Sequence, residues 1–222
     1  TLDSRATTAN TVTYTSASVT FAANTLALIF ARSAGTTAAV TASGLLTWAA
    51  ETAVQFPAAA SVHRLTLFTA QVAVSTGPGV VTFSGGSMTG FIYGIEEIGG
   101  ADTTDGVVQV TTSNAADVST IDITLSGFTS ADNRTFAGFM FSTALLGTPE
   151  VGYTELVDLT HAAPNANMVA AWTNAADLSP GCTWAALATV AAIGIEVKAT
   201  AAAPGVGFGP LLAMYRNYHI RA

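Results

Sequence analysis

The residue types that carry most enzyme chemistry are sparse in this chain, and they are not spaced for a reaction. Three histidines, His63, His161 and His219, lie in unrelated settings, and no nucleophile-elbow pattern surrounds a serine. A hydrolytic triad needs a base within hydrogen-bond reach of its nucleophile, and zinc sites need histidines at spacings such as His-x-His. Neither pattern occurs in the sequence. We therefore expect each histidine to be a surface or interface residue.

Paired carboxylates are the other candidate for catalysis, because glycoside hydrolysis uses two of them. Glu96 and Glu97 are adjacent, so on a strand they point to opposite faces and cannot share a substrate. Glu155 and Asp158 flank an expected strand without a partner whose position can be inferred. We expect solvated acids at strand edges, where charge also discourages unwanted strand pairing. A β-sandwich hydrolase, which needs two acids converging in a cleft, is a minor alternative.

Metal, disulfide and glycan sites have weak support. Asp102 and Asp105 could supply two oxygens to calcium, but calcium takes six to eight and the EF-hand spacing is missing, so an Asx turn is the simpler role. Cys182 is the only cysteine, which excludes an intrachain disulfide and predicts a small buried apolar residue. Asn133, in Asn-Arg-Thr, matches the glycosylation sequon, which matters only in a secretory setting. We expect no cofactor.

Aromatic residues suggest one binding alternative. Trp48, Trp172 and Trp184 together with Tyr153 could form a platform that stacks on the apolar face of a sugar ring. In a β-sandwich of this size, however, tryptophans commonly fill the core or a subunit interface. We favour packing, and a lectin-like carbohydrate-binding module stays open as the alternative function.

The elements that must position these residues are short strands. Apolar residues alternate with Thr, Ser and Ala at many places along the chain, and Gly- or Pro-containing turns recur between these runs. Leu26–Phe30 is apolar on both faces, which predicts a central buried strand, and Ile121–Leu125 alternates cleanly. No segment carries a helical stripe, and we expect Ala185–Ala192 to be a strand. The sequence predicts an all-β protein, a two-sheet antiparallel β-sandwich of jelly-roll type.

Charge is scarce over the whole chain. Only 9% of the 222 residues are charged while 50% are hydrophobic, and the net charge is -7. An acidic chain with seven Lys and Arg cannot build the basic groove that nucleic acid requires. The longest apolar stretch, Ala185–Val197, falls short of the ~20 residues that span a bilayer. A weakly charged surface is typical of a protein covered by neighbours, which favours an assembly component over an enzyme.

The composition changes near residue 200. Residues 1–200 form the predicted sandwich domain, and residues 201–222 form a Gly/Pro linker followed by a basic, aromatic tail. Of the seven Lys and Arg, Arg216 and Arg221 lie in the tail, which leaves five against 14 Asp and Glu elsewhere, a net charge of -9. We expect the tail to dock onto a partner through Leu211, Leu212, Met214, Tyr215, Arg216, Tyr218, Ile220 and Arg221. A disordered or self-packing terminus is the alternative.

Three short sequence segments resemble segments of β-sandwich proteins encoded by tailed bacteriophages. They are Leu45-Leu46-Thr47-Trp48, Gly152-Tyr153-Thr154-Glu155-Leu156 and Ile193-Gly194-Ile195-Glu196-Val197-Lys198. The resemblance covers approximately residues 10–200 and carries no catalytic motif. It implies a non-enzymatic part of a virion: a capsid decoration, head-fibre or tail accessory protein.

The expected partners follow from that resemblance. They are further copies of the chain, with a trimer as one candidate, and capsid or tail proteins, without nucleic acid or membrane. Under the carbohydrate-binding alternative, the protein is extracellular or on a cell surface and binds a host glycan.

Overall fold

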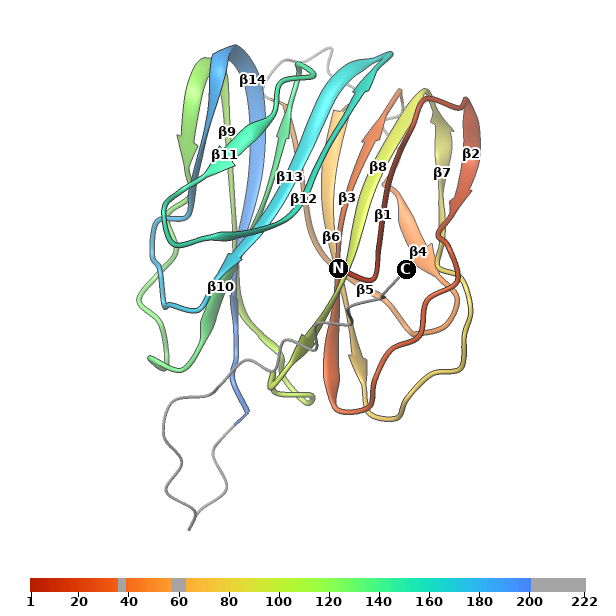
Figure 1. The fold of residues 1–222 in the computed structure, drawn as a ribbon, viewed down its shortest axis with the longest axis vertical. Coiled ribbons are helices and arrows are strands. Elements are labelled where there is room, and N and C mark those ends of the chain that lie inside the picture. The colour runs from red at the N-terminus through yellow and green to blue at the C-terminus, as the bar shows by residue number, and fades with distance from the viewer. Residues whose placement is uncertain (36–38, 57–62, 201–222) are drawn as a thin grey trace, which may run out of the picture.

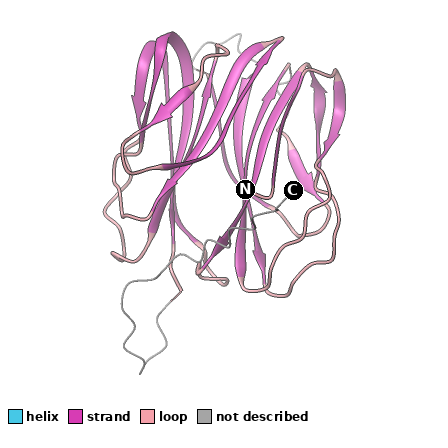
Figure 2. Cartoon of the chain, viewed as in Figure 1, coloured by secondary structure: helices cyan, strands magenta, loops and turns pink. Residues whose placement is uncertain are grey.

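The computed structural model describes residues 1–35, 39–56 and 63–200, and every regular element in these ranges is a β-strand (Figure 2). All strand pairs are antiparallel, which confirms the predicted all-β, antiparallel class. No helix long and apolar enough to cross a membrane occurs in these ranges. The predicted docking tail lies outside the described residues.

The first sheet is built by the N-terminal half of the chain around one fully buried strand. In order across the sheet, its strands are β1 (Asp3–Thr7), β8 (Gly90–Gly99), β3 (Thr25–Ala34), β6 (His63–Val72) and β5 (Ala49–Gln55). All ten residues of β3 are buried, as the run Leu26–Phe30 predicted. A strand that is apolar on both faces needs cover on both faces, so β3 lies at the centre of its sheet and between two other layers.

The second sheet is built by the C-terminal half of the chain. Its strands are β11 (Gly147–Pro149), β14 (Gly181–Val197), β10 (Arg134–Phe141), β13 (Asn165–Thr173) and β12 (Thr154–Ala162), with β9 (Val107–Asp122) also paired to β14. Residues 185–192 lie inside β14, which confirms the expected strand there. A cluster of buried residues, including Leu28, Phe30, Met140, Met168 and Ile193, fills the space between the first and second sheets.

A third, smaller sheet covers the other face of the first sheet. It contains β2 (Thr11–Thr15), β7 (Thr82–Met88) and β4 (Thr41–Ser43), and Figure 1 shows the first sheet lying between the other two. Ala27, Ile29 and Phe68 of the first sheet pack with Phe83 of β7 in a second buried cluster. The structure therefore adds a layer to the expected two-sheet sandwich. The jelly-roll connection stays a prediction, because the strand order does not confirm it: the chain completes one large sheet before it starts the other.

The long β9–β14 ribbon also covers the outer face of the second sheet. The pairing register of β9 and β14 shifts between Thr183 and Ala188. Near this shift, Cys182 and Trp184 of β14 belong to the same buried cluster as Phe139 and Phe141 of β10. The pairing continues past β9, since Ile123 donates a backbone hydrogen bond to the Pro180 carbonyl at 3.0 Å. The ribbon thus acts as part of the second sheet and as its outer cover.

Candidate functional site

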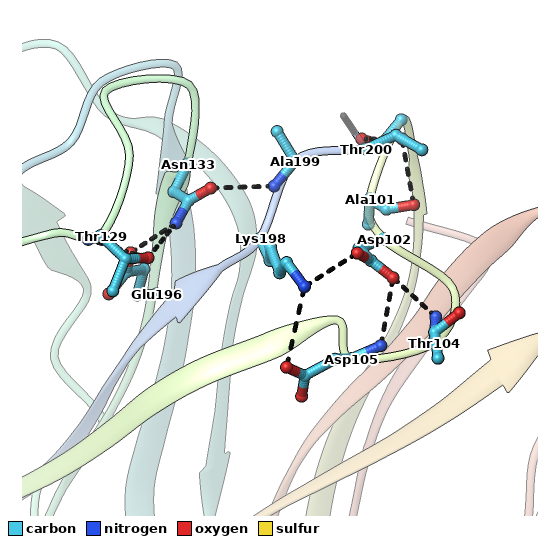
Figure 3. Close-up of polar contacts among 11 residues, drawn as sticks. Ala101, Asp102, Thr104, Asp105, Thr129, Asn133, Glu196, Lys198, Ala199 and Thr200 are labelled. Atoms are coloured by element: carbon cyan, nitrogen blue, oxygen red, sulfur yellow. Dashed lines mark hydrogen bonds and ion pairs between the residues drawn. The ribbon is translucent and has the colours of Figure 1, made fainter. Parts of the chain in front are cut away.

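The residues that follow β14 form a polar network with two loops (Figure 3). The backbone N–H of Lys198 donates to the carbonyl of Gly106 at 2.9 Å, and the Lys198 carbonyl accepts from Asp102 at 2.8 Å. The N–H of Thr200 donates to Gly100 at 2.9 Å. These hydrogen bonds fix the backbone at Lys198 and Thr200, directly before residues 201–222.

The two candidate calcium ligands take part in this network. The ammonium of Lys198 lies 3.0 Å from Asp102 Oδ2 and 3.7 Å from Asp105 Oδ2. Asp102 Oδ1 accepts the backbone N–H of Thr104 at 2.8 Å and that of Asp105 at 3.1 Å, the geometry of an Asx turn. The bond from Thr104, together with Lys198, lowers the pKa of Asp102. Both carboxylates are thus paired with the Lys198 ammonium, and that of Asp102 also accepts two backbone N–H groups of the loop.

Glu196 is the buried acid of the network. Its side chain is fully buried and accepts hydrogen bonds from Gln109 Nε2 at 2.6 Å, from Asn133 Nδ2 at 2.5 Å and from the N–H and hydroxyl of Thr129, both at 3.1 Å. Burial acts to raise its pKa, but the bonds from Asn133, Gln109 and Thr129 outweigh burial and lower the pKa. The hydrogen bonds to this carboxylate link the loop around residue 130 to β14.

The sequon asparagine is part of the same structure. Asn133 is 1% exposed; its amide nitrogen donates to Glu196 and Thr129, and its carbonyl oxygen accepts from the Ala199 N–H at 3.0 Å. The nitrogen that a glycan would modify is therefore buried and hydrogen-bonded in the folded chain. Asn133 has a structural role in this fold.

The four aromatic residues of the carbohydrate-binding hypothesis lie in different layers. Trp48 packs against the cluster between the first and third sheets, whereas Trp172 packs against the cluster between the first and second. Trp184 is 7% exposed and belongs to the outer cluster, while Tyr153 donates to Asp177 at 2.8 Å. The four side chains do not form one platform, so the arrangement offers no shared sugar-stacking surface.

The sequence predicts each histidine to be a surface or interface residue; a surface position is wrong for His161, which is 7% exposed. His161 Nε2 is 2.6 Å from Nη1 of Arg32, a fully buried residue of β3, and His63 Nδ1 binds Nη2 of the same guanidinium. An added Cβ at Gly90 would lie 2.7 Å from the His161 ring, so the absence of a side chain there makes room for the imidazole. No motif in the sequence marks Arg32 as a site residue. Its signal was a basic residue that continues an apolar run.

The predicted strand-edge position is also wrong for Glu96. Its strand, β8, has β1 on one side and β3 on the other, and Glu96 is 2% exposed. Its carboxylate accepts the hydroxyl of Thr1 at 3.0 Å and lies 2.9 Å from the Thr1 amine. Glu97 on the opposite face accepts the backbone N–H of Ala22. The two neighbouring acids point apart, as predicted.

Glu155 and Asp158 lie closer together than strand periodicity predicts. A bulge in β12 makes Glu155 pair with Ala171 and Val157 pair with Ala170, so Leu156 is an extra residue. Residues three apart normally face opposite ways, but the bulge turns Glu155 and Asp158 to one face. Burial, followed by the charge of Asp158, raises the pKa of Glu155. Asp158 is also bonded to Asn167 Nδ2, so one of the two acids already has a protein partner.

Within residues 1–35, 39–56 and 63–200, no group of three or more His, Cys, Asp and Glu side chains is arranged to hold a metal ion. Comparisons with protein-family models, with curated proteins and with solved structures found no match. The case for a function therefore rests on the chain's own strands, edges and charges.

Proposed function

We propose that this protein is a non-enzymatic structural subunit of a homo-oligomeric assembly, joined through a strand edge and through its C-terminal tail. The narrower form of the proposal is a virion protein of a tailed bacteriophage, as capsid decoration, head fibre or tail accessory protein. That narrower form is supported by the sequence resemblance alone.

The observation that carries the proposal is the uncharged edge of β9. Among the described residues, this 16-residue strand pairs only with β14, and it has neither a charged residue nor a proline from Val107 to Ala116. The edge strand β12 has Glu155 and Asp158, and β1 has Asp3 and Arg5. Monomeric proteins usually protect long edges with charge, proline or bulges. β9 has bulges where its register with β14 shifts, between Val107 and Gln109 and between Ala115 and Val118, so the regular, uncharged stretch that another chain could cover is Gln109–Ala115.

The edge of β9 lies on the same side of the molecule as the edge strand β5. Asn114 Nδ2 of β9 donates to the Gln55 carbonyl of β5 at 3.1 Å, which joins the first and second sheets at this side. Both sheets therefore end together, and a neighbouring copy can approach both of them at once. Contact through main-chain edges and small Thr, Ser and Ala side chains needs no charge and little side-chain ordering.

Charge balance supports a role for the tail. The described residues contain all 14 acids and five of the seven basic residues, whereas the tail adds Arg216 and Arg221 and no acid. The network at Lys198 and Thr200 fixes the point from which the tail starts. An acidic body followed by a basic, apolar segment is suited to contacts between copies or with a shell protein of the assembly.

Native mass measurement of the full chain tests the proposal. We expect an oligomer at micromolar concentration, and Thr112→Lys, which places a charge at an exposed position of β9, should weaken association at least tenfold. Thr154→Lys adds the same charge at an exposed position of β12 and serves as the matched control. A wild-type monomer, or an equal loss of association in both variants, would contradict the proposed interface.

A further inference from the structure

The guanidinium of Arg32 is a charged group buried between the two large sheets without an acidic partner. Arg32 has 0% exposed surface, and its side chain reaches from β3 in the first sheet to His161 of β12 in the second. His63, the first residue of β6, binds the other terminal nitrogen. The three side chains come from three strands and form what we call the Arg32 cluster.

In the described part of the chain, Arg32 has no Asp or Glu as an ion-pair partner. All 14 Asp and Glu residues lie in the described ranges, and the ion pairs formed there involve Glu96, Asp102 and Asp105 with other cations. The segments 36–38, 57–62 and 201–222 contain neither Asp nor Glu in the sequence. Among the described residues, no Asp or Glu side chain therefore forms an ion pair with Arg32.

The two histidines cannot supply negative charge either. A guanidinium only donates hydrogen bonds, so the ring nitrogens that contact it must be acceptors, and each imidazole is neutral. Burial, followed by the charge of Arg32, lowers the pKa of each histidine to about 4. Burial lowers the pKa of Arg32 to about 9, so the guanidinium stays charged at neutral pH. The cluster as a whole has a charge of one positive unit.

One nitrogen of the guanidinium has no hydrogen-bond partner among the described residues. Nε of Arg32 is buried and makes no hydrogen bond, whereas Nη1 and Nη2 are each engaged by a histidine. Removing a charge from water is costly unless the charge is paired, and an unsatisfied buried donor adds to that cost. Planar guanidinium groups match the two oxygens of a carboxylate, sulfate or phosphate with parallel N–H bonds.

We propose that the Arg32 cluster is a binding site for a small oxyanion. The anion accepts from the Nε side of Arg32 and neutralises its charge, while the two imidazoles hold the guanidinium in place. His63 is only partly buried and marks the side of the cluster nearest to solvent. The site is independent of the proposed assembly interface, because none of its three residues belongs to β9 or to the tail.

Sulfate titration of the full-length protein, followed through the ring resonances of its histidines, tests this inference. At constant ionic strength and pH 7, we expect a saturable shift of the His63 and His161 signals. At saturating sulfate, the pKa of each of these histidines should rise from about 4 by at least one unit, because the bound anion offsets the repulsion from Arg32. A shift that grows linearly with sulfate, or unchanged pKa values, would overturn the proposal.

Two variants give an independent readout. Arg32→Lys keeps the charge but loses Nε and the planar fork, and it should weaken sulfate binding at least tenfold. Arg5→Gln removes an exposed arginine of β1 and should leave binding unchanged. Equal loss in both variants would reveal general attraction to surface charge and reject the site. If Arg32→Lys does not fold, the wild-type pKa shifts decide the question by themselves.

Discussion

Glu196 illustrates how one residue of this chain can hold several segments together. Four donor contacts from Gln109, Thr129 and Asn133 converge on a carboxylate that is fully buried. Such bonds to a charged acceptor are stronger than bonds between neutral groups, and they keep the carboxylate ionised despite its burial. The loop around residue 130 and the end of β14 therefore depend on a single charge.

Glu196→Gln should destabilise the fold by about 1–3 kcal/mol, because the amide nitrogen of glutamine cannot accept the bonds that the carboxylate oxygen receives. The measurement is chemical denaturation at pH 7, with the exposed Glu155→Gln as control. The lowered pKa of Glu196 means that its contribution is present above its ordinary pKa of 4.5 and is lost as the pH falls below that value. An equal effect of both substitutions would argue against the network.

The Arg32 cluster predicts a second loss of stability at a higher pH. His63 and His161 have pKa values of about 4 in the fold against 6.5 ordinarily, so between these values the unfolded chain binds more protons than the folded chain. The free energy of unfolding should therefore decrease as the pH falls from about 6.5 to about 4. Urea midpoints across this range measure the effect, and His161→Gln should flatten the slope. A wild-type midpoint that does not change over this range would contradict the contacts.

At the scale of the element, the close approach of the two large sheets limits which side chains their strands can have. A Cβ at Gly138 of β10 would lie closer than van der Waals contact to the Phe30 ring of β3, which packs between the sheets, so the two would overlap. Neither side has room to move, because both strands are central in their sheets. A glycine in a strand interior here serves close packing.

Gly138→Ala should cost about 1–3 kcal/mol through overpacking of the core. Gly127→Ala is the matched control, since an added Cβ there would meet nothing within 4 Å. Thermal unfolding of both variants gives the comparison. We expect a lower midpoint for Gly138→Ala alone, and a similar midpoint for both variants would show that the sheets can separate at this point without cost.

At the scale of the element, a strand with one simple pattern of apolar residues could be predicted from the sequence. The apolar run Leu26–Phe30 predicted a central strand, and β3 is buried along its whole length. The expected strand-edge position of Glu155 and Asp158 agrees with their place on the edge strand β12, but the sequence did not predict that the bulge at Leu156 turns both side chains to one face. A bulge is set by the partner strand, and no residue in the local sequence marks it.

At the scale of the molecule, the chain of 222 residues has three buried clusters. Two of them lie between the sheets, and the third lies on the outer face of the second sheet under the β9–β14 ribbon. Among the described residues, all members of these clusters precede residue 200. The stability of the body and the role of the tail can therefore be separated by experiment.

Deletion of residues 201–222 should leave the thermal midpoint of the body unchanged and reduce assembly. The reason is that the backbone bonds of Lys198 and Thr200 join residues that the deletion leaves in place. Calorimetry and native mass measurement of both chains check the two parts of this prediction. A large fall in the midpoint would show that the tail belongs to the body, and unchanged assembly would remove it from the interface.

The sequence by itself determined the all-β class, the central position of β3 and the strand character of β14, because these depend on the period and length of apolar runs. Only the tertiary structure decided where the few charges lie. Arg32, Glu96 and Glu196 are buried because neighbouring strands surround them, and the two imidazoles at Arg32 come from residues 31 and 129 positions away. Contacts over such separations depend on sheet order and register, which no local pattern of residues specifies.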